Sequence, residues 1–254
     1  MDGILLVDKP RGWTSFDVVN YVRKIVAQAQ NKKPKQVKVG HTGTLDPLAT
    51  GLLVLLIGTY TKRAPKLSKL DKTYEVSMKL GETSTTGDRE GEITKVLNKK
   101  PAQKELETAL DRFTGDISQT PPAFSAIKVG GQRAYKLARA GKEVKLESRP
   151  AKIYQLKLKS YNYPSVEFTA KVSSGTYIRS LVEDIGKELK TGAYMSDLRR
   201  TQVGDFDIKN TVKIENLTAE QQVQAIQAII DKAPKQMIEE AFAWDVERQT
   251  TDHQ

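Results

Sequence analysis

The residues with the clearest chemical potential lie in one loop, residues 41–51, with the sequence HTGTLDPLATG. Asp46 is a single carboxylate among small residues, and the apolar run of residues 52–57 follows directly. Gly43 permits close approach of the backbone to a ligand, and Pro47 biases Asp46 toward an extended conformation. A lone acid at the start of a buried strand suggests a chemical role, yet Asp-Pro pairs also initiate ordinary turns. The residue types alone favour an ordinary turn at Asp46 over a chemical role.

Composition excludes several other kinds of active site. The chain of 254 residues contains no cysteine, which excludes disulfides, thiolate catalysis and cysteine-ligated zinc. His41 and His253 are its only histidines, so a catalytic zinc or a Ser-His-Asp triad would have to rest on His41. Neither arrangement is favoured by this composition.

Charge points to a polyanionic partner. The formal net charge is +10, and residues 215–254 hold eight acids against three bases, so residues 1–214 carry +15. Nucleic acid is favoured over a membrane because no basic amphipathic anchor stands out. No apolar run reaches the length of a signal peptide or a transmembrane helix, and we expect a cytoplasmic protein.

Hydrophobic periodicity predicts alternating strands and helices. Strands are expected at residues 3–7, in the apolar run after Gly51, at 74–80 and at 166–172, and a helix is expected at 103–113. A helix capped by Thr14 and Asp17 should bury one face, formed by Phe16, Val19, Val22, Ile25 and Val26. The helix beginning near Ile178 places Arg179 in its first turn, where a cation opposes the helix dipole and favours a carboxylate partner.

Two segments are strongly basic. Residues 31–38 hold four lysines and one proline, and are expected to form an exposed loop that is either solvated or in contact with phosphate. Residues 128–152 hold eight bases and two acids and read as a projecting, hairpin-like insertion with a helical stretch at residues 132–140. Its charge and its embedded aromatic residue favour contact with RNA over a surface segment that contacts only solvent. The candidate contact residues are Lys128, Arg133, Tyr135 and Arg139.

Six short motifs carry a resemblance to a known family. They are GILLVDKP from Gly3, GHTGTLDPLATG from Gly40, KTY from Lys72, PPAFSAIK from Pro121, GTYIRSL from Gly175 and DLRRT from Asp197. In this order, from residue 3 to about residue 204, they resemble the TruB family of tRNA pseudouridine synthases.

The resemblance implies a fold, a reaction and roles for individual residues. The fold is α/β (α+β), with a mixed, mostly antiparallel sheet flanked by helices and a basic thumb-like insertion. The reaction is the isomerisation of a flipped-out uridine in the T-arm loop of tRNA (position 55) to pseudouridine. Asp46 is the implied nucleophile, Tyr74 stacks on the uracil, and Arg179 is the ion-pair partner of Asp46. Tyr177 and Leu198 line the nucleotide pocket, and His41 occupies the space that the uridine leaves.

The expected domain organisation follows from the same resemblance. Residues 1–214 form the catalytic domain, with the thumb-like insertion at about 120–152, and residues 215–254 form an acidic helical extension where many relatives have a PUA domain. Thr85 stands where an Asp is expected in many relatives. We expect a monomer that acts on tRNA without a cofactor, a metal, a guide RNA or a membrane.

Two alternatives belong to other functional classes. An RNA chaperone or RNA-particle scaffold could keep this fold without chemistry, but the intact Asp46, Tyr74 and Arg179 argue against loss of catalysis. A glycoside or nucleoside hydrolase would require two carboxylates around the scissile bond, and the motifs supply only one.

Overall fold

The computed structural model describes residues 1–96, 100–125, 127–142, 144–213 and 224. Its centre is a ten-stranded sheet with the order β14-β1-β3-β12-β4-β11-β10-β7, in which β2 pairs with β3 and β13 with β12. The strands are β1 (Gly3–Lys9), β2 (Val39–His41), β3 (Thr50–Ile57), β4 (Lys72–Leu80), β7 (Gly115–Gln119), β10 (Arg149–Asn162), β11 (Ser165–Val172), β12 (Ala193–Val203), β13 (Phe206–Asp207) and β14 (Val212–Lys213).

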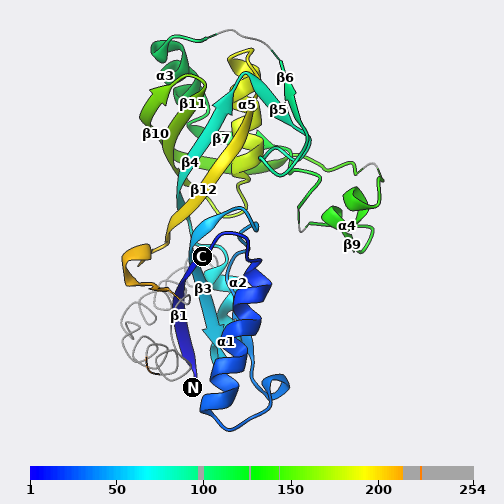
Figure 1. Cartoon of the computed structure of the whole chain (residues 1–254), viewed down its shortest axis with the longest axis vertical. Helices are drawn as coiled ribbons and strands as arrows, with labels where there is room; N and C mark the ends of the chain where they lie inside the picture. The colour runs from blue at the N-terminus through cyan, green and yellow to red at the C-terminus, as the bar shows by residue number, and fades with distance from the viewer. Residues whose placement is uncertain (97–99, 126, 143, 214–223, 225–254) are drawn as a thin grey trace, which may run out of the picture.

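Helices cover this sheet in two groups, which give the molecule an elongated shape (Figure 1). One half contains β1, β3 and α1 (Ser15–Ala29), and the other contains β4, β10, β11 and β12 with α3 (Gln103–Arg112) and α5 (Ile178–Glu188). The remaining elements are α2 (Ala64–Leu67), α4 (Ala134–Arg139), the 3-10 turns η1 (Pro34–Gln36), η2 (Gly58–Arg63) and η3 (Ile208–Asn210), and the hairpins of β5 (Glu82–Ser84) with β6 (Ile93–Lys95) and of β8 (Lys128–Val129) with β9 (Gln132–Arg133).

The sheet is mixed and mostly antiparallel, as predicted. Strand β1 runs parallel to β14, and β3 runs parallel to β12, whereas the other pairings in this sheet are antiparallel. The parallel pairing of β3 with β12 joins the two halves of the molecule and involves only Thr50 with Arg199 and Gly51 with Arg200. The predicted α+β class is therefore confirmed.

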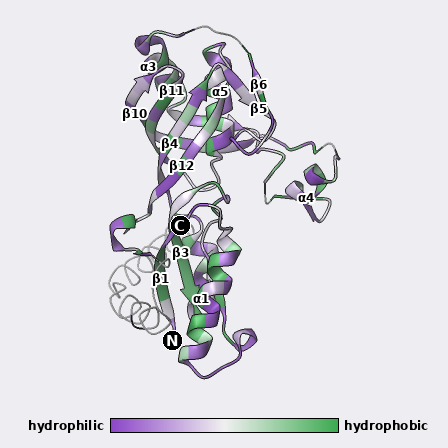
Figure 2. Cartoon of the chain, in the orientation of Figure 1, coloured by the Kyte–Doolittle hydropathy of each residue, from purple (hydrophilic) through white to green (hydrophobic). Residues whose placement is uncertain are grey.

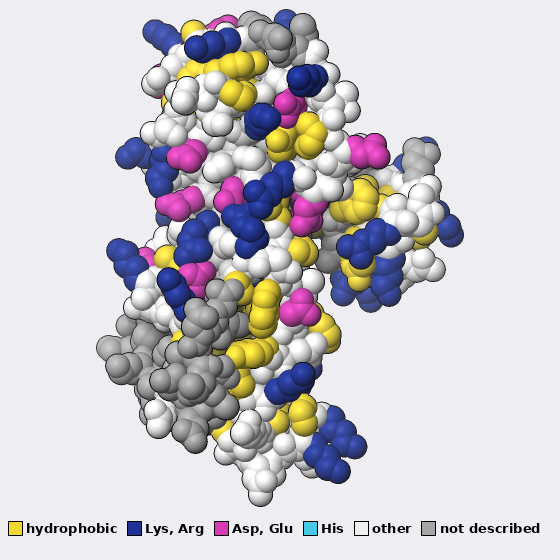
Figure 3. Space-filling view, in the orientation of Figure 1, with side chains coloured by type: hydrophobic (Ala, Val, Ile, Leu, Met, Phe, Trp, Pro, Cys, Tyr) yellow, Lys and Arg dark blue, Asp and Glu magenta, His cyan; other side chains and the backbone are white. Residues whose placement is uncertain are grey.

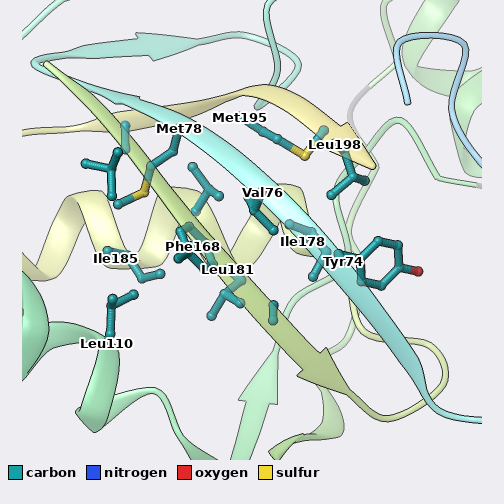
Figure 4. Close-up of a cluster of buried hydrophobic side chains, with 14 of the residues drawn as sticks. Tyr74, Val76, Met78, Leu110, Phe168, Ile178, Leu181, Ile185, Met195 and Leu198 are labelled. Atoms are coloured by element: carbon teal, nitrogen blue, oxygen red, sulfur yellow. The ribbon is translucent and has the colours of Figure 1, made fainter. Parts of the chain in front are cut away.

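The apolar side chains of the sheet pack on both of its faces. In the half that contains α1, alternate residues of β1 and β3 enter either a cluster with α1 or a cluster with Leu67, Val203 and Phe206. Seven of the eight residues of β3 are therefore buried, and the strand is hydrophobic along its length (Figure 2). In the other half, alternate residues of β4 and β11 pack against α3 and α5, with Phe168 near the centre (Figure 4).

Most predicted elements are found at their expected places. The strands at residues 3–7, 74–80 and 166–172 lie within β1, β4 and β11, and the helix at 103–113 corresponds to α3. Thr14 and Asp17 form the predicted capping box of α1. The predicted acidic extension, residues 215–254, lies outside the described residues except for Gln224.

The prediction that Phe16 lies on the buried face of α1 is wrong. Its side chain is 62% exposed, whereas Val18 and Val22 are fully buried. Residues three apart in an α-helix are rotated by about 300° about the helix axis, which is about 60° short of a full turn. A series with this spacing therefore moves around the helix by about 60° at each step. Phe16 is the first member of that series, and the drift carries it away from the face centred near Val18 and Val22.

The boundaries predicted for the basic insertion are also corrected. Gln132 and Arg133 form β9 instead of helix, because Gly130 and Gly131 have positive φ angles of 55° and 82° and close a tight hairpin with β8. Helix α4 begins only at Ala134. Residues 149–152 belong to β10 and pair with β7 in the central sheet, so the projecting segment ends before them.

The joint between the two halves yields the first testable prediction. Gly51 has a φ of +100°, and a Cβ at this position would lie 2.3 Å from the carbonyl oxygen of Arg200. We expect Gly51→Ala to lower the free energy of unfolding by about 2–4 kcal/mol, from backbone strain and the clash together. Urea denaturation followed by circular dichroism measures this loss.

Gly115→Ala is the matched control, because Gly115 has a φ of +111° with no atom within 4 Å of the added Cβ. It should show only the smaller cost of the backbone conformation, about 1–2 kcal/mol. Equal losses for the two variants would contradict the close approach of β3 and β12.

Candidate active site

The loop that contains Asp46 is fixed by hydrogen bonds from the segment after β1. Ser15 Oγ accepts from the Leu45 amide at 2.8 Å and donates to the Leu45 carbonyl at 3.0 Å. The amide of Gly12 donates to the Pro47 carbonyl at 2.9 Å, and Lys9 Nζ donates to the same oxygen at 3.3 Å. Residues on both sides of Asp46 are therefore held, and its carboxylate has a defined position.

Asp46 forms an ion pair with Arg179, as predicted. Arg179 Nη2 lies 3.1 Å from Asp46 Oδ2, and the side chain of Arg179 is only 7% exposed, whereas that of Asp46 is 38% exposed. Because Arg179 lies in the first turn of α5, its charge opposes the helix dipole, and the carboxylate offsets that cost. The arginine thus lies behind the carboxylate, and part of Asp46 faces solvent.

Arg179 is itself anchored by three further groups. Its Nη1 donates to the Thr86 carbonyl at 3.1 Å, its Nη2 donates to the Phe124 carbonyl at 2.8 Å, and its Nε lies 3.8 Å from Asp88 Oδ2. Asp88 is 4% exposed and accepts hydrogen bonds from the Thr86 hydroxyl and the Glu90 amide. The planar guanidinium is therefore held in one orientation, which a flexible lysine could not reproduce.

A cavity of about 640 Å³ opens in front of this ion pair. The predicted residues that line it are Asp46, Tyr74, Arg179, Tyr177, Leu198, Tyr135 and Arg139. Tyr74 lies at the end of the apolar cluster, with its phenolic oxygen directed away from that cluster (Figure 4). The cavity therefore combines an apolar wall, three tyrosines and a paired carboxylate, and its walls come from several distant segments of the chain.

The basic insertion contributes directly to this cavity. Tyr135 and Arg139 lie on α4, where the Arg139 guanidinium is 5.7 Å from the centre of the Tyr135 ring. The amide of Tyr135 donates to the Ser125 carbonyl at 3.0 Å, which ties α4 to the segment that also holds Arg179. The structure thus places two of the four candidate insertion residues at the site.

Three predicted residues do not line the cavity. Lys128 and Arg133 pair with each other across the exposed β8–β9 hairpin. His41 ends β2, and its Nδ1 accepts a hydrogen bond from the Gly43 amide at 3.3 Å. Burial, together with the nearby charge of Arg200, lowers the pKa of His41, so it supports the loop as a neutral ring.

Three buried cations at the site were missed by sequence reasoning. Lys9 donates to the carbonyls of Pro10, Trp13 and Pro47, Lys72 to those of Ser68 and Leu70, and Arg200 to those of Leu52 and Gly43. Burial lowers the pKa of Lys9 and of Lys72 to about 8 in each case. Each lies within one of the motifs quoted above, but a basic residue in a strand is usually interpreted as exposed.

Further polar groups at the cavity were also missed. Ser125 Oγ is buried at the cavity wall beside Tyr177, which also lines the cavity. Asp88 and the exposed Glu90 add two further carboxylates to the cavity wall, although the motif analysis supplied only one. Because Asp88 is buried against Arg179, it is already engaged as an anchor, and Asp46 is the more exposed of the two acids that pair with Arg179.

Among the described residues, no group of three or more His, Cys, Asp or Glu side chains is arranged to hold a metal ion. In the described portion of the chain, no helix combines the length and apolar character needed to span a bilayer.

Arg179 is more deeply buried than Asp46, so substitutions of the two residues should change the free energy of unfolding by different amounts. Arg179→Met removes the partner of the buried Asp88 and leaves two carbonyls unbonded, so we expect the free energy of unfolding to fall by about 3–5 kcal/mol. Asp46→Asn should change it by less than about 1 kcal/mol, because Asp46 is partly exposed. Urea titrations of the two variants measure both effects, and equal destabilisation would contradict this division of roles.

Comparison with known proteins identifies the family. Residues 30–178 match the TruB family pseudouridylate synthase (N terminal domain), and residues 179–239 match the tRNA pseudouridylate synthase B C-terminal domain. The second match crosses the boundary predicted at residue 214.

Relatives and solved structures agree with this match. The tRNA pseudouridine synthase B of Stutzerimonas stutzeri is 46% identical over 220 residues, covering 85% of this chain and 68% of the relative. That of Clostridium novyi is also 46% identical over 220 residues, covering 87% and 73%.

A chain in the crystal structure of a Cbf5-Nop10-Gar1 complex superposes with a TM-score of 0.64 and 29% identity, over 85% of this chain and 53% of that one. The fold is that of the pseudouridine synthases. The chain belongs to the TruB family of pseudouridylate synthases.

Proposed function

We propose that this protein isomerises a uridine of tRNA to pseudouridine, and that the target is the T-arm loop uridine at position 55. The reaction breaks the N1–C1′ glycosidic bond, forms a C5–C1′ bond, releases the proton from C5 and adds a proton to N1, so the product is an isomer of the substrate. The names of the relatives support the tRNA substrate and the isomerase class. The position in the tRNA follows from the motif resemblance.

The observation that carries this proposal is the Asp46–Arg179 ion pair at the wall of a cavity of nucleotide size. Arg179 stabilises the ionised carboxylate, and the exposed part of Asp46 is free to attack. Attack on C1′ or on C6 of the uracil, or removal of the C2′ proton, is compatible with this geometry. In each case Asp46 converts one difficult substitution into easier steps.

Tyr74 and the apolar wall hold the detached base in this proposal. The ring of Tyr74 is buried beside Leu198 and Ile178 and forms part of the cavity wall, and its phenolic oxygen points away from the apolar cluster. A uracil stacked against it keeps its orientation while the glycosidic bond is open, and base–aromatic stacking stabilises the complex by about 1–3 kcal/mol. The phenol is also in a position to assist proton transfer at C5.

The insertion grips the RNA around the flipped nucleotide. Arg139 and Tyr135 provide a cation and a ring at the cavity edge, which suit phosphate and base contacts respectively. Flipping the uridine costs a few kcal/mol of lost stacking, and these contacts offset part of that cost. We propose that the protein acts as a monomer in the cytoplasm, without a guide RNA.

Turnover provides the direct test of the reaction. Wild-type protein should release tritium from tRNA labelled at uridine C5, and Asp46→Asn should lower the rate by at least about 10³-fold, as expected when a nucleophile is lost. RNA binding, measured by filter retention, should persist in the variant. Binding without release by the wild type would instead support the RNA chaperone, and normal turnover by Asp46→Asn would remove Asp46 from its role.

The insertion provides a second, positional test. Arg139→Glu should weaken binding of a T-arm hairpin more than Arg133→Glu, because Arg139 lines the cavity whereas Arg133 lies on the β8–β9 hairpin. Each lost phosphate contact should reduce the slope of log affinity against log salt by roughly 0.7–0.9. Fluorescence anisotropy over a range of salt concentrations measures both quantities. Equal effects would mean that the whole insertion contributes only diffuse charge.

A further inference from the structure

A second basic hollow lies on the half of the molecule that contains α1. It is an open groove of about 670 Å³ between α1, the loop around η1 and the strand β2. Three cations, Arg23, Lys35 and Lys38, line it, together with Thr61 and uncharged residues between positions 34 and 40. We refer to these residues as the α1–β2 groove; none of them lines the cavity that holds Asp46.

The charge of this groove is of one sign. No Asp or Glu occurs between Asp17 and Asp46, whereas that stretch contains six Lys or Arg residues. Lys35 and Lys38 are exposed, and no ion pair among the described residues involves either of them. Unpaired cations on adjacent loop positions are suited to a polyanion.

Arg23 gives the groove a fixed cationic centre. Its guanidinium donates to the Asn20 side chain at 2.6 Å and to the Val39 carbonyl at 3.2 Å. These two bonds orient the group and leave the rest of its five N–H donors for another acceptor. A pre-oriented arginine flanked by mobile lysine side chains is an arrangement that favours phosphate oxygens.

The groove is also close to the catalytic loop. Val39 and Gly40 of β2 line the groove, His41 ends that strand, and Thr42 lines the cavity. At about 3.3 Å per residue, the two sites are separated by about 10 Å along the strand. Figure 3 shows Lys and Arg side chains gathered both over the loop after α1 and over the α4 segment, on the same side of the molecule.

We infer that the α1–β2 groove is an RNA-contact surface that binds the phosphate backbone flanking the reacting nucleotide. This inference rests on the proposed function for the identity of the RNA. With a nucleotide in the cavity and α4 on one side of it, the groove holds the backbone from the other side. Contact is to phosphate and is independent of base sequence, because every charged side chain that lines the groove is a cation.

The test is the double variant Lys35→Glu/Lys38→Glu in the full chain. The control is Lys157→Glu/Lys171→Glu, which makes the same charge change at exposed positions of β10 and β11. The probes are an unmodified T-arm hairpin and a full tRNA transcript, with affinity measured by anisotropy over a range of salt concentrations. Thermal unfolding of each variant shows whether the fold is retained.

The groove variant should bind both RNAs at least about tenfold more weakly than the control, with a salt slope lower by roughly 0.7–0.9 per lost contact. Its kcat at saturating RNA should equal that of the wild type, with KM raised. Affinity and slope equal to those of the control would overturn the inference. Groove-dependent binding by a wild-type protein that releases no tritium would contradict the proposed reaction and leave the groove assignment intact.

Discussion

The ion pair between Arg179 and Asp46 is the interaction on which the rest of the site depends. One guanidinium, buried at the start of α5, contacts the loop of residues 41–51 through Asp46, the β5–β6 connection through Thr86, and the base of the insertion through Phe124. These segments lie far apart in the sequence, so a single side chain fixes their relative positions. Asp88 lies on the same guanidinium and gives the arginine a second carboxylate partner besides Asp46.

Buried cations also hold the backbone near Asp46 in place, through hydrogen bonds to its carbonyl groups. Lys9 and Arg200 donate to carbonyls of the loop on either side of Asp46, and Lys72 does the same for the turn before β4. A loop of small residues has few side chains with which to pack, and these donors replace packing by hydrogen bonds. Burial disfavours the charge of each lysine, which is why the pKa of both Lys9 and Lys72 is reduced to about 8. The rigidity of the loop around Asp46 therefore carries an electrostatic cost.

Much of this arrangement could be predicted from the sequence, and the remainder could not for identifiable reasons. Period-two alternation located β4 and β11, and the motifs located Asp46, Tyr74 and Arg179. Strand β12 was not predicted, because Asp197, Arg199 and Arg200 interrupt its apolar pattern, although Arg200 is buried. Which insertion residues reach the cavity depends on the turn at Gly130 and Gly131, and no periodicity in the sequence specifies that geometry.

The attachment of the insertion has a consequence for how such an enzyme can diversify. Phe124 and Ser125 connect it to Arg179 and to α4 through carbonyl oxygens, which every residue type possesses. The side chains on α4 are therefore free to vary without disturbing the ion pair, as long as the backbone path is kept. In evolutionary terms, the insertion can change its side chains as a separate module, while the geometry around Arg179 stays the same.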